Sequence, residues 1–323
     1  TRRNLEIVEP LTPGSRTLLD VVDYAVTPMG GRLLRNWLLA PLLRLDRIRA
    51  RHEAVQELVE NADLRREIRS LLKEMRDLER LAVRVASGRC GPRDLLAVRS
   101  SLEILAPLRD ALADVCSELL RQHAEGVDPL PELAGLIRDA IADDAPASVS
   151  EGGVIRAGFD PRLDELRELR EGAVEWIARL QARERERTGI GSLKVGFNKV
   201  FGYYIEVSRA NLDRVPDDFQ RRQTLSNAER YVTPELKEWE EKVFGAEEKI
   251  ASLEASLFEE TRRAAAQYTT TLQETAGHVA ALDVLAGLAE AAVRNGYVRP
   301  EMHDGYDLAI RGGRHPVVET MMP

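Results

Sequence analysis

Apolar residues recur at helical spacing along most of the chain. The clearest stripe has steps of three and four positions in alternation, which is the heptad pattern of a coiled-coil seam: Leu236, Trp239, Val243, Ala246, Ile250, Leu253 and Leu257. A second stripe lies within residues 159–187 and is formed by Leu163, Leu166, Ala173, Trp176, Ile177 and Leu180. Because a single insert joins the two segments, the pattern predicts two long antiparallel helices.

Residues 1–158 carry shorter helical patterns. Thr27 followed by Pro28 is typical of a helix start, and Pro41 of a helix end. Further helices are expected from about Asp46, over 64–86, over 92–122 with a kink or break at Pro107, and over 133–141. We therefore expect a mainly α protein in which residues 1–158 form a helical bundle core, residues 159–187 the first long helix, and residues 233–298 the returning helix and more of the core.

Residues 188–232 interrupt the helical pattern with a glycine-rich insert of β type. Apolar residues alternate over 193–197, and residues 203–207 are typical of a returning strand, which together indicate a β-hairpin. Residues 223–232 are expected to add a third strand before Thr233 caps the next helix. The insert is therefore predicted to be a small antiparallel β domain held between the two long helices.

Residues 299–323 indicate the beginning of another domain. Residues 308–310 and 313–319 have the composition of short strands. We expect this domain to continue beyond Pro323, and both ends of the chain to belong to a longer protein.

Composition narrows the class of protein. The chain has 323 residues with 44% hydrophobic, 5% aromatic and 31% charged residues, which suits long helices with charged outer faces. Its two cysteines, Cys90 and Cys116, have neither disulfide-framework nor zinc spacing, and a reducing cytoplasmic location is expected. We find no apolar run near the roughly 18 residues of a membrane span, so no membrane association is expected.

Charge is distributed unevenly. The formal net charge is −8, yet residues 188–232 contain seven basic and five acidic residues, a net of +2. Such an arrangement attracts a polyanion to the insert and repels it elsewhere.

The insert is rich in side chains that donate hydrogen bonds, beside exposed glycine backbone. Donors of this kind suit contacts with phosphate, which need no base-reading geometry. An equally simple interpretation is a solvated charged face that binds nothing. The candidate DNA-binding residues are Lys194, Asn198, Lys199, Ser208, Arg209, Arg221, Arg222, Gln223, Thr224, Asn227 and Arg230.

Other polar patterns favour structural roles. The alternating charges of residues 183–187 predict an exposed helix face with local ion pairs, His315 is expected to have a loop or structural role, and Phe258 to be a packing residue. The five histidines do not pair at metal-binding spacing. No phosphate-loop, nucleophile-elbow or zinc-protease motif occurs, so we expect no catalysis, cofactor or metal in this chain.

Several segments resemble the central part of the MutS family of DNA mismatch-recognition ATPases. In the first half these are 1–7, 27–34, 37–38 and 47–55. In the insert they are Leu193–Asn198, Gly202–Ile205, Arg221–Leu225 and Asn227–Tyr231. The likeness covers essentially the whole chain.

The resemblance implies a core domain, two lever helices and a clamp at residues 188–232 that touches the backbone of double-stranded DNA. Residues 313–319 match the opening strand of the family's ATPase domain, so 299–323 would begin a truncated copy of it. The mismatch-reading domain, the connector, the Walker segments and the dimerising helix-turn-helix would lie outside this chain. ATP and Mg²⁺, a homodimer and a MutL-type repair partner would therefore belong to the parent protein, which the resemblance places in the cytoplasm and on the nucleoid.

The clamp also favours the repair protein itself, because a family branch that lacks the mismatch-reading domain also lacks the clamp. An alternative from another class is a coiled-coil scaffold whose insert docks a protein partner. The long helices and the acidic total charge motivate that alternative.

Overall fold

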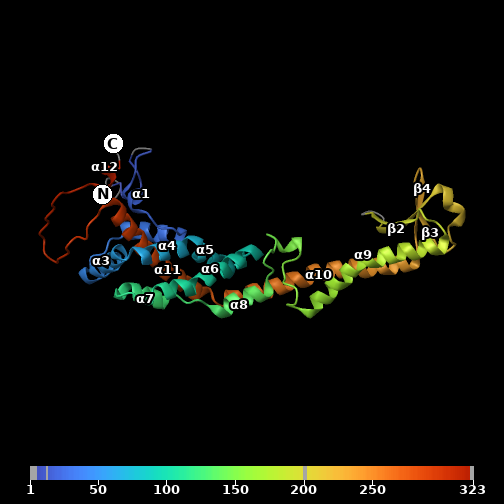
Figure 1. Cartoon of the computed structure of the whole chain (residues 1–323), viewed down its shortest axis with the longest axis horizontal. Coiled ribbons are helices and arrows are strands. Elements are labelled where there is room, and N and C mark those ends of the chain that lie inside the picture. The colour runs from blue at the N-terminus through green and yellow to red at the C-terminus, as the bar shows by residue number, and fades with distance from the viewer. Residues whose placement is uncertain (1–5, 12–13, 199–201, 321–323) are drawn as a thin grey trace. The chain divides into compact units, whose positions relative to one another are not determined.

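A computed structural model describes residues 6–11, 14–198 and 202–320, apart from the side chains of Ala173 and Val174 (Figure 1). The chain divides into two compact units, one of residues 1–143 with 260–323 and one of residues 144–259. One division falls at residue 143 and the other inside the returning helix. The expected mainly α architecture with one small antiparallel sheet is confirmed.

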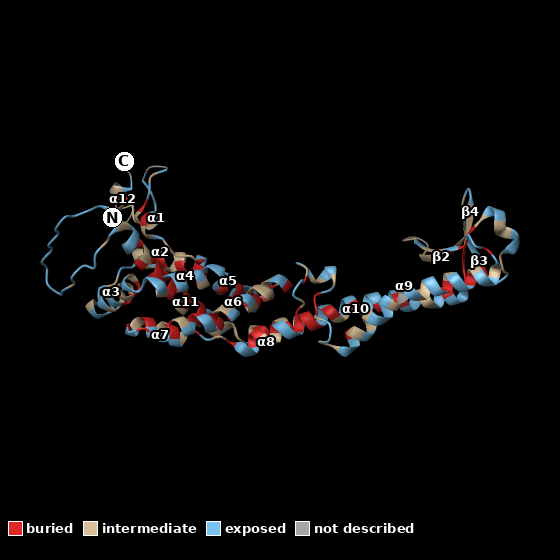
Figure 2. Ribbon diagram, viewed as in Figure 1, coloured by how far each residue is buried: buried red, intermediate tan, exposed pale blue. Residues whose placement is uncertain are grey.

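The first unit is a helical bundle arranged around one central helix. That helix, α11 (Thr269–Asn295), contacts α2, α3, α4, α5 and α7, and Figure 2 shows buried residues concentrated along it. Around it lie α1 (Leu18–Val22), α2 (Pro28–Leu39), α3 (Leu45–Glu60), α4 (Ala62–Glu74), α5 (Leu78–Ala86), α6 (Pro92–Ala111), α7 (Glu118–Gly126) and α8 (Pro131–Ala140).

The central helix corrects one expectation. By length and composition alone α11 could cross a membrane, contrary to the absence of any such run inferred from the sequence. However, 67% of its apolar window is buried inside the protein. A helix that is apolar on all sides is also what the middle of a bundle requires, because every face meets another helix.

Helix ends follow the sequence signals more closely than helix interiors do. The Thr27 side chain accepts a hydrogen bond from the backbone N–H of Gly30, which confirms the predicted start of α2. Pro107 neither breaks nor divides α6, which continues to Ala111. The stretch expected over 92–122 is instead divided at residues 112–117, where Ser117 caps α7.

The second unit contains two long helices and the insert. Helix α9 (Pro161–Thr188) lies beside α10 (Pro234–Ala266), which begins in this unit and ends in the first. Trp176 stacks on Trp239 with ring centroids 4.4 Å apart. Arg183 pairs with Glu235 nearer one end, and Arg167 with Glu254 nearer the other. Partner numbers fall on α10 as they rise on α9, so the helices are antiparallel as predicted.

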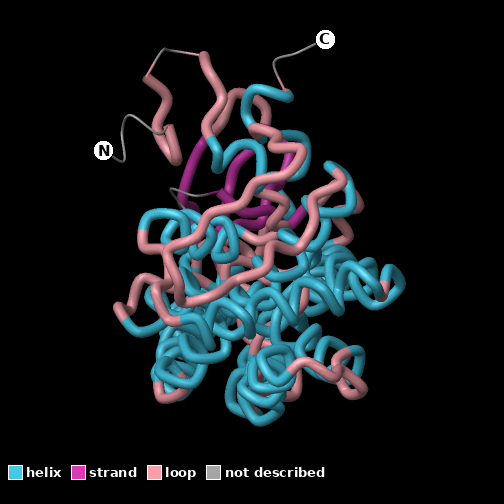
Figure 3. Tube along the Cα trace, turned by 90° about the vertical axis from the view of Figure 1, so that its left-hand side faces the viewer, coloured by secondary structure: helices cyan, strands magenta, loops and turns pink. Residues whose placement is uncertain are grey.

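The insert folds into one four-stranded antiparallel sheet of order β1-β2-β4-β3 (Figure 3). Its strands are β1 (Lys194–Asn198), β2 (Gly202–Ser208), β3 (Gln220–Thr224) and β4 (Ala228–Val232), with the short 3₁₀ helix η3 (Arg209–Arg214) after β2. The expected first hairpin is confirmed. The single third strand expected over 223–232 is wrong, because the chain turns at residues 225–227 and forms two strands.

One face of the sheet packs on the ends of the two long helices. The shared core joins Leu180 of α9 and Leu236 of α10 to Ile205, Val207 and Tyr231 of the strands. Thr233 caps α10 by accepting a hydrogen bond from Leu236, as predicted. The insert therefore has a hydrophobic core of its own and one face left for polar residues.

The described part of residues 299–323 contains no strand. Residues 313–319, expected as a strand, instead end in the short helix α12 (Pro316–Glu319). A strand needs a hydrogen-bonded neighbour, and the strands of the described residues all lie in the insert. The His315 imidazole accepts a hydrogen bond from the N–H of Val318, which is the structural role expected of it.

Candidate nucleic-acid interface

A row of polar side chains crosses the sheet on the face opposite its core. Lys194 pairs in register with Glu206, Glu206 with Arg230, and Arg230 with Gln223. Because side chains alternate between faces along a strand, these four lie opposite the buried Ile205. The register thus brings together three of the candidate residues, Lys194, Gln223 and Arg230, from three different strands.

Arg230 is already engaged within this row. Its Nε donates to Glu206 at 3.0 Å, and a terminal nitrogen donates to the Gln223 amide oxygen at 3.0 Å. The guanidinium also lies 4.0 Å from the centroid of the Tyr204 ring. The candidate is therefore part of the polar row, but its charge is largely neutralised by Glu206. Sequence reasoning did not identify Glu206 and Tyr204, because only the register places them beside Arg230.

The hairpin of β3 and β4 gathers a second group of candidates. The register shifts between Arg221 and Gln223, so Arg222 is an extra residue in a β-bulge and its side chain is exposed. Arg209, which follows β2, also contacts this hairpin: its backbone N–H donates to the Asn227 carbonyl at 3.1 Å and its guanidinium to the Leu225 carbonyl at 3.4 Å. The exposed Thr224 lies on the same hairpin.

Arg221 lies nearer the core side of the sheet. Its guanidinium is 3.6 Å from Glu229, whose other oxygen accepts a hydrogen bond from Tyr231 at 2.6 Å. Burial and this hydrogen bond raise the pKa of Tyr231 to about 12. Arg221 therefore borders the Tyr231 side of the sheet rather than the polar row.

Two further candidates, Ser208 and Asn198, lie in the first hairpin. Ser208 accepts a hydrogen bond from the Asn211 amide at 3.0 Å, and the same amide reaches Ser192 at 3.2 Å. Asn198 ends β1, opposite Gly202 in the register. Lys199 lies outside the described residues.

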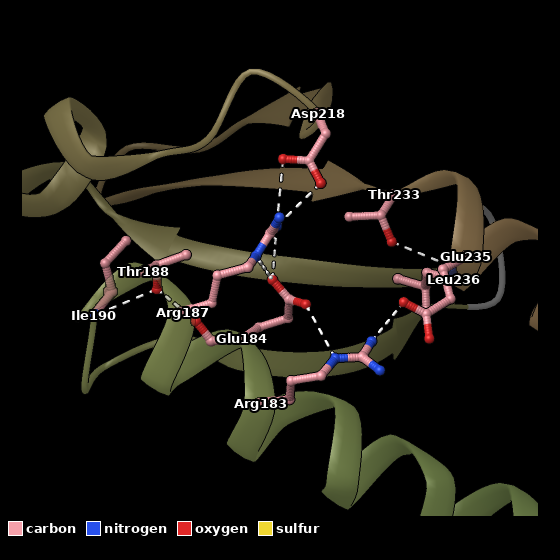
Figure 4. Close-up of polar contacts among 9 residues, drawn as sticks. All are labelled: Arg183, Glu184, Arg187, Thr188, Ile190, Asp218, Thr233, Glu235 and Leu236. Carbon is pink, nitrogen blue, oxygen red and sulfur yellow. Dashed lines mark hydrogen bonds and ion pairs between the residues drawn. The ribbon is translucent and has the colours of Figure 1, made fainter.

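Ion pairs fix the sheet to the end of α9 (Figure 4). The buried Glu184 accepts from Arg187 at 2.8 Å and lies 3.5 Å from Arg183. Arg187 also forms an ion pair with Asp218 at 3.0 Å, and Arg183 forms one with Glu235 at the start of α10. The alternating run 183–187 was expected to form an exposed helix face with local ion pairs. The local ion pairs are present, but Glu184 is buried, because the insert covers that side of the helix.

These groups can hold an extended anion but do not resemble a catalytic site. Amide, hydroxyl and guanidinium donors predominate, with Glu206 as an internal counter-charge. Within residues 6–11, 14–198 and 202–320, no three His, Cys, Asp or Glu side chains gather as metal ligands do. The arrangement suits binding to a phosphate backbone.

Comparisons with known proteins give the family. A model described as MutS domain III matches residues 1–289. The chain is 51% identical to a DNA mismatch repair protein MutS of Symbiobacterium thermophilum, covering 100% of this chain and 37% of that protein. It is 49% identical to the MutS of Pelotomaculum thermopropionicum, over 100% of this chain and 38% of that protein. It is 47% identical to the MutS of Methanosarcina acetivorans, over 99% of this chain and 36% of that protein. The chain thus spans little more than a third of these relatives, and it belongs to the MutS family.

Proposed function

We propose that this chain grips the backbone of double-stranded DNA through its insert and transmits that contact through α9 and α10, as part of a mismatch repair protein. The observation that carries the proposal is the donor-rich polar face of the sheet, turned away from a core that fixes it to both helices. Backbone contacts of this kind hold DNA without reading its sequence.

The arginines of the insert divide into two classes. Arg230 is paired with Glu206, whereas the exposed Arg222 lies in the bulge and Arg209 reaches the β3–β4 turn. The second class is better placed to replace counterions on phosphate. If one insert neutralises about three phosphates, the logarithm of the binding constant should fall with that of the salt concentration at a slope near −3.

The test compares duplex DNA binding by the wild type and by the double variant Arg222→Ala, Asn227→Ala over a salt series. We expect weaker binding and a shallower slope in the double variant. A matched control is Arg170→Ala, which removes an exposed positive charge from α9 outside the insert and should leave both quantities nearly unchanged. Equal affinity of the wild type and the double variant for duplex DNA would contradict the assignment of Arg222 and Asn227 to DNA binding. Absence of DNA binding, with salt-independent behaviour, would favour a protein-docking scaffold.

In a full-length protein, we propose that the long helices relate DNA contact to ATP hydrolysis elsewhere in the chain. The full-length protein would bind ATP with Mg²⁺. It would act with a second copy of itself and a MutL-type partner, in the cytoplasm and on the nucleoid. The supporting feature is that α10 runs unbroken from Pro234 to Ala266, past the boundary between the two units. A continuous helix is a stiff element for such coupling.

Proline in the exposed part of α10 tests the coupling. Ala251→Pro costs about 3 kcal/mol in a helix and breaks its hydrogen bonding, whereas Ala251→Gly costs about 1 kcal/mol and keeps it. In the full-length protein we expect the proline variant to bind DNA and to hydrolyse ATP, but to lose the effect of DNA on hydrolysis. Normal stimulation in that variant would contradict the lever role while leaving the backbone contact intact.

A further inference from the structure

A groove opens in the helical unit, within residues 1–143 and 260–323. It has a volume of about 680 Å³ and lies among α2, α3, α11 and residues 297–300. Its walls are mostly apolar side chains that are only half covered, among them Leu38, Leu42, Ile48, Val55, Val59 and Leu288. Residues of this type are buried when a partner is available, so the groove has the character of a binding surface.

A guanidinium lies in this apolar setting. Arg51 is stacked over the Trp37 ring, with its central carbon 3.4 Å from the ring centroid. Among the described residues, no carboxylate lies within ion-pair distance of Arg51, whereas Arg32, Arg65 and Arg84 of the bundle each have such a partner. Burial and the neighbouring Arg47 lower the pKa of Arg51. A half-buried charge without a counter-ion is unfavourable, and an incoming anion would relieve that cost.

The other charged groups near the groove are of both signs. Arg299 lines it, and Arg49 and Glu301 line the adjoining pocket. His52 also lines the groove, but burial and Arg299 lower its pKa, so it adds no charge at neutral pH. Glu53 lies 3.7 Å from Arg299 and leaves Arg51 uncompensated. The uncompensated guanidinium of Arg51 therefore favours an occupant that carries a carboxylate.

The length of the groove indicates what kind of occupant fits. Along α3 its lining runs from Ile48 to Val59, which at about 1.5 Å per residue is roughly 16 Å, or three helical turns. A single small acid would cover only part of that length. An amphipathic helix laid in a groove between helices presents apolar side chains at intervals of three and four residues and matches such a surface.

We propose that this groove binds an acidic amphipathic helix from outside this chain, with its apolar side chains against α2, α3 and α11 and one carboxylate paired with the guanidinium of Arg51. The pair would be bidentate, since a planar guanidinium and a carboxylate match in geometry. The proposal is independent of DNA binding by the insert.

The test uses two labelled helical peptides of about 15 residues, long enough to cover the groove. Both carry leucines at helical spacing and an otherwise uncharged polar face; one has a glutamate beside the leucine stripe, and the other has glutamine there. Fluorescence anisotropy should show the glutamate peptide binding the wild type roughly tenfold more tightly, as expected for one buried charged pair. Arg51→Met should abolish that preference while still binding the glutamine peptide, which also shows that the groove is folded.

Matched variants sharpen the result. Arg66→Met removes a positive charge from the exposed face of α4 and should keep the preference, whereas Arg51→Lys should keep only part of it, because lysine lacks the planar fork. The proposal is overturned if neither peptide binds, or if Arg51→Met retains the preference. It is equally overturned if 4-phenylbutyrate binds in an Arg51-dependent manner while the peptides do not, since a free small acid would then be the occupant.

Discussion

At the scale of single residues, Asp283 shows how one buried carboxylate joins two helices. From α11 it accepts hydrogen bonds from the N–H of Val26 at 2.9 Å, and from the N–H and hydroxyl of Thr27 at 2.8 and 2.6 Å. Thr27 in turn caps α2. Gly30 makes this approach possible, because a Cβ there would collide with the carboxylate.

We therefore expect Asp283→Ala to lower the free energy of unfolding by roughly 3 kcal/mol, because it leaves buried donors without an acceptor. Urea denaturation followed by circular dichroism measures this. Asp307→Ala, at an exposed position, is the control and should unfold like the wild type. A loss of well under 1 kcal/mol in Asp283→Ala would mean that water or other groups replace the carboxylate.

His123 gives a prediction about pH. Its Nδ1 lies 3.1 Å from the Nδ1 of His278, although the two are far apart in sequence. Burial, His278 and Arg51 lower the pKa of His123 to about 4 from 6.5. Below pH 6.5 the unfolded chain takes up a proton that the folded protein refuses until about pH 4, so this group removes stability as the pH falls through that range.

The measurement is the difference in free energy of unfolding between the wild type and His123→Asn at several pH values. Taking a difference cancels the carboxylates that titrate nearby. We expect the advantage of the wild type to shrink from pH 7 toward pH 4, while the exposed His303→Asn shows no such trend. A difference independent of pH would show that His123 is protonated alike in both states.

At the scale of elements, the polar row across the sheet sets how much positive charge the insert offers. Glu206 accepts a hydrogen bond from Arg230 at 3.0 Å and so offsets one positive charge of the insert. Under the proposed function, Glu206→Gln should raise the affinity for duplex DNA by roughly fivefold at low salt and steepen the salt dependence by about one unit. Glu168→Gln, an exposed change on α9, is the matched control. Unchanged affinity in Glu206→Gln would place the DNA contact away from the row.

How far the sequence predicts an element depends on whether its signal is local. The heptad stripe of α10 is confirmed, since Leu236, Val243, Ala246, Ile250 and Leu257 are buried, and Phe258 is buried as expected. Helix periodicity needs only neighbours in the chain. By contrast, the turn at residues 225–227 has no glycine or proline, and the strand that it divides was predicted as one.

Contacts between distant segments were not predicted, because no local sequence pattern indicates them. Glu184 and Glu254 were part of ordinary charged helix faces in the sequence, yet both are buried. Glu254 pairs with Arg167 and accepts from the N–H of Gly153 at 2.9 Å, and that partnership exists only once the chain has folded. In the candidate site, residue types were predictable, but the neutralisation of Arg230 was not, because it depends on strand register.

At the scale of the whole molecule, the two compact units have separate hydrophobic cores. Leu105 of α6 is fully buried in the bundle, and Leu193 is fully buried in the core beneath the sheet. Replacing either by alanine removes a similar volume and should cost about 3 kcal/mol locally. Proteins built of several units need not unfold in one step.

We expect Leu193→Ala to speed amide hydrogen exchange in residues 188–236 and to leave residues 92–126 protected, with Leu105→Ala doing the reverse. Mass spectrometry of peptides from each unit measures this directly, and a calorimetric scan should show each substitution lowering a different transition. Because α10 passes from one unit into the other, the opposite result is also physically possible. If either substitution accelerated exchange equally in both units, α10 would join them into one cooperative structure, and the insert could not open without loosening the bundle.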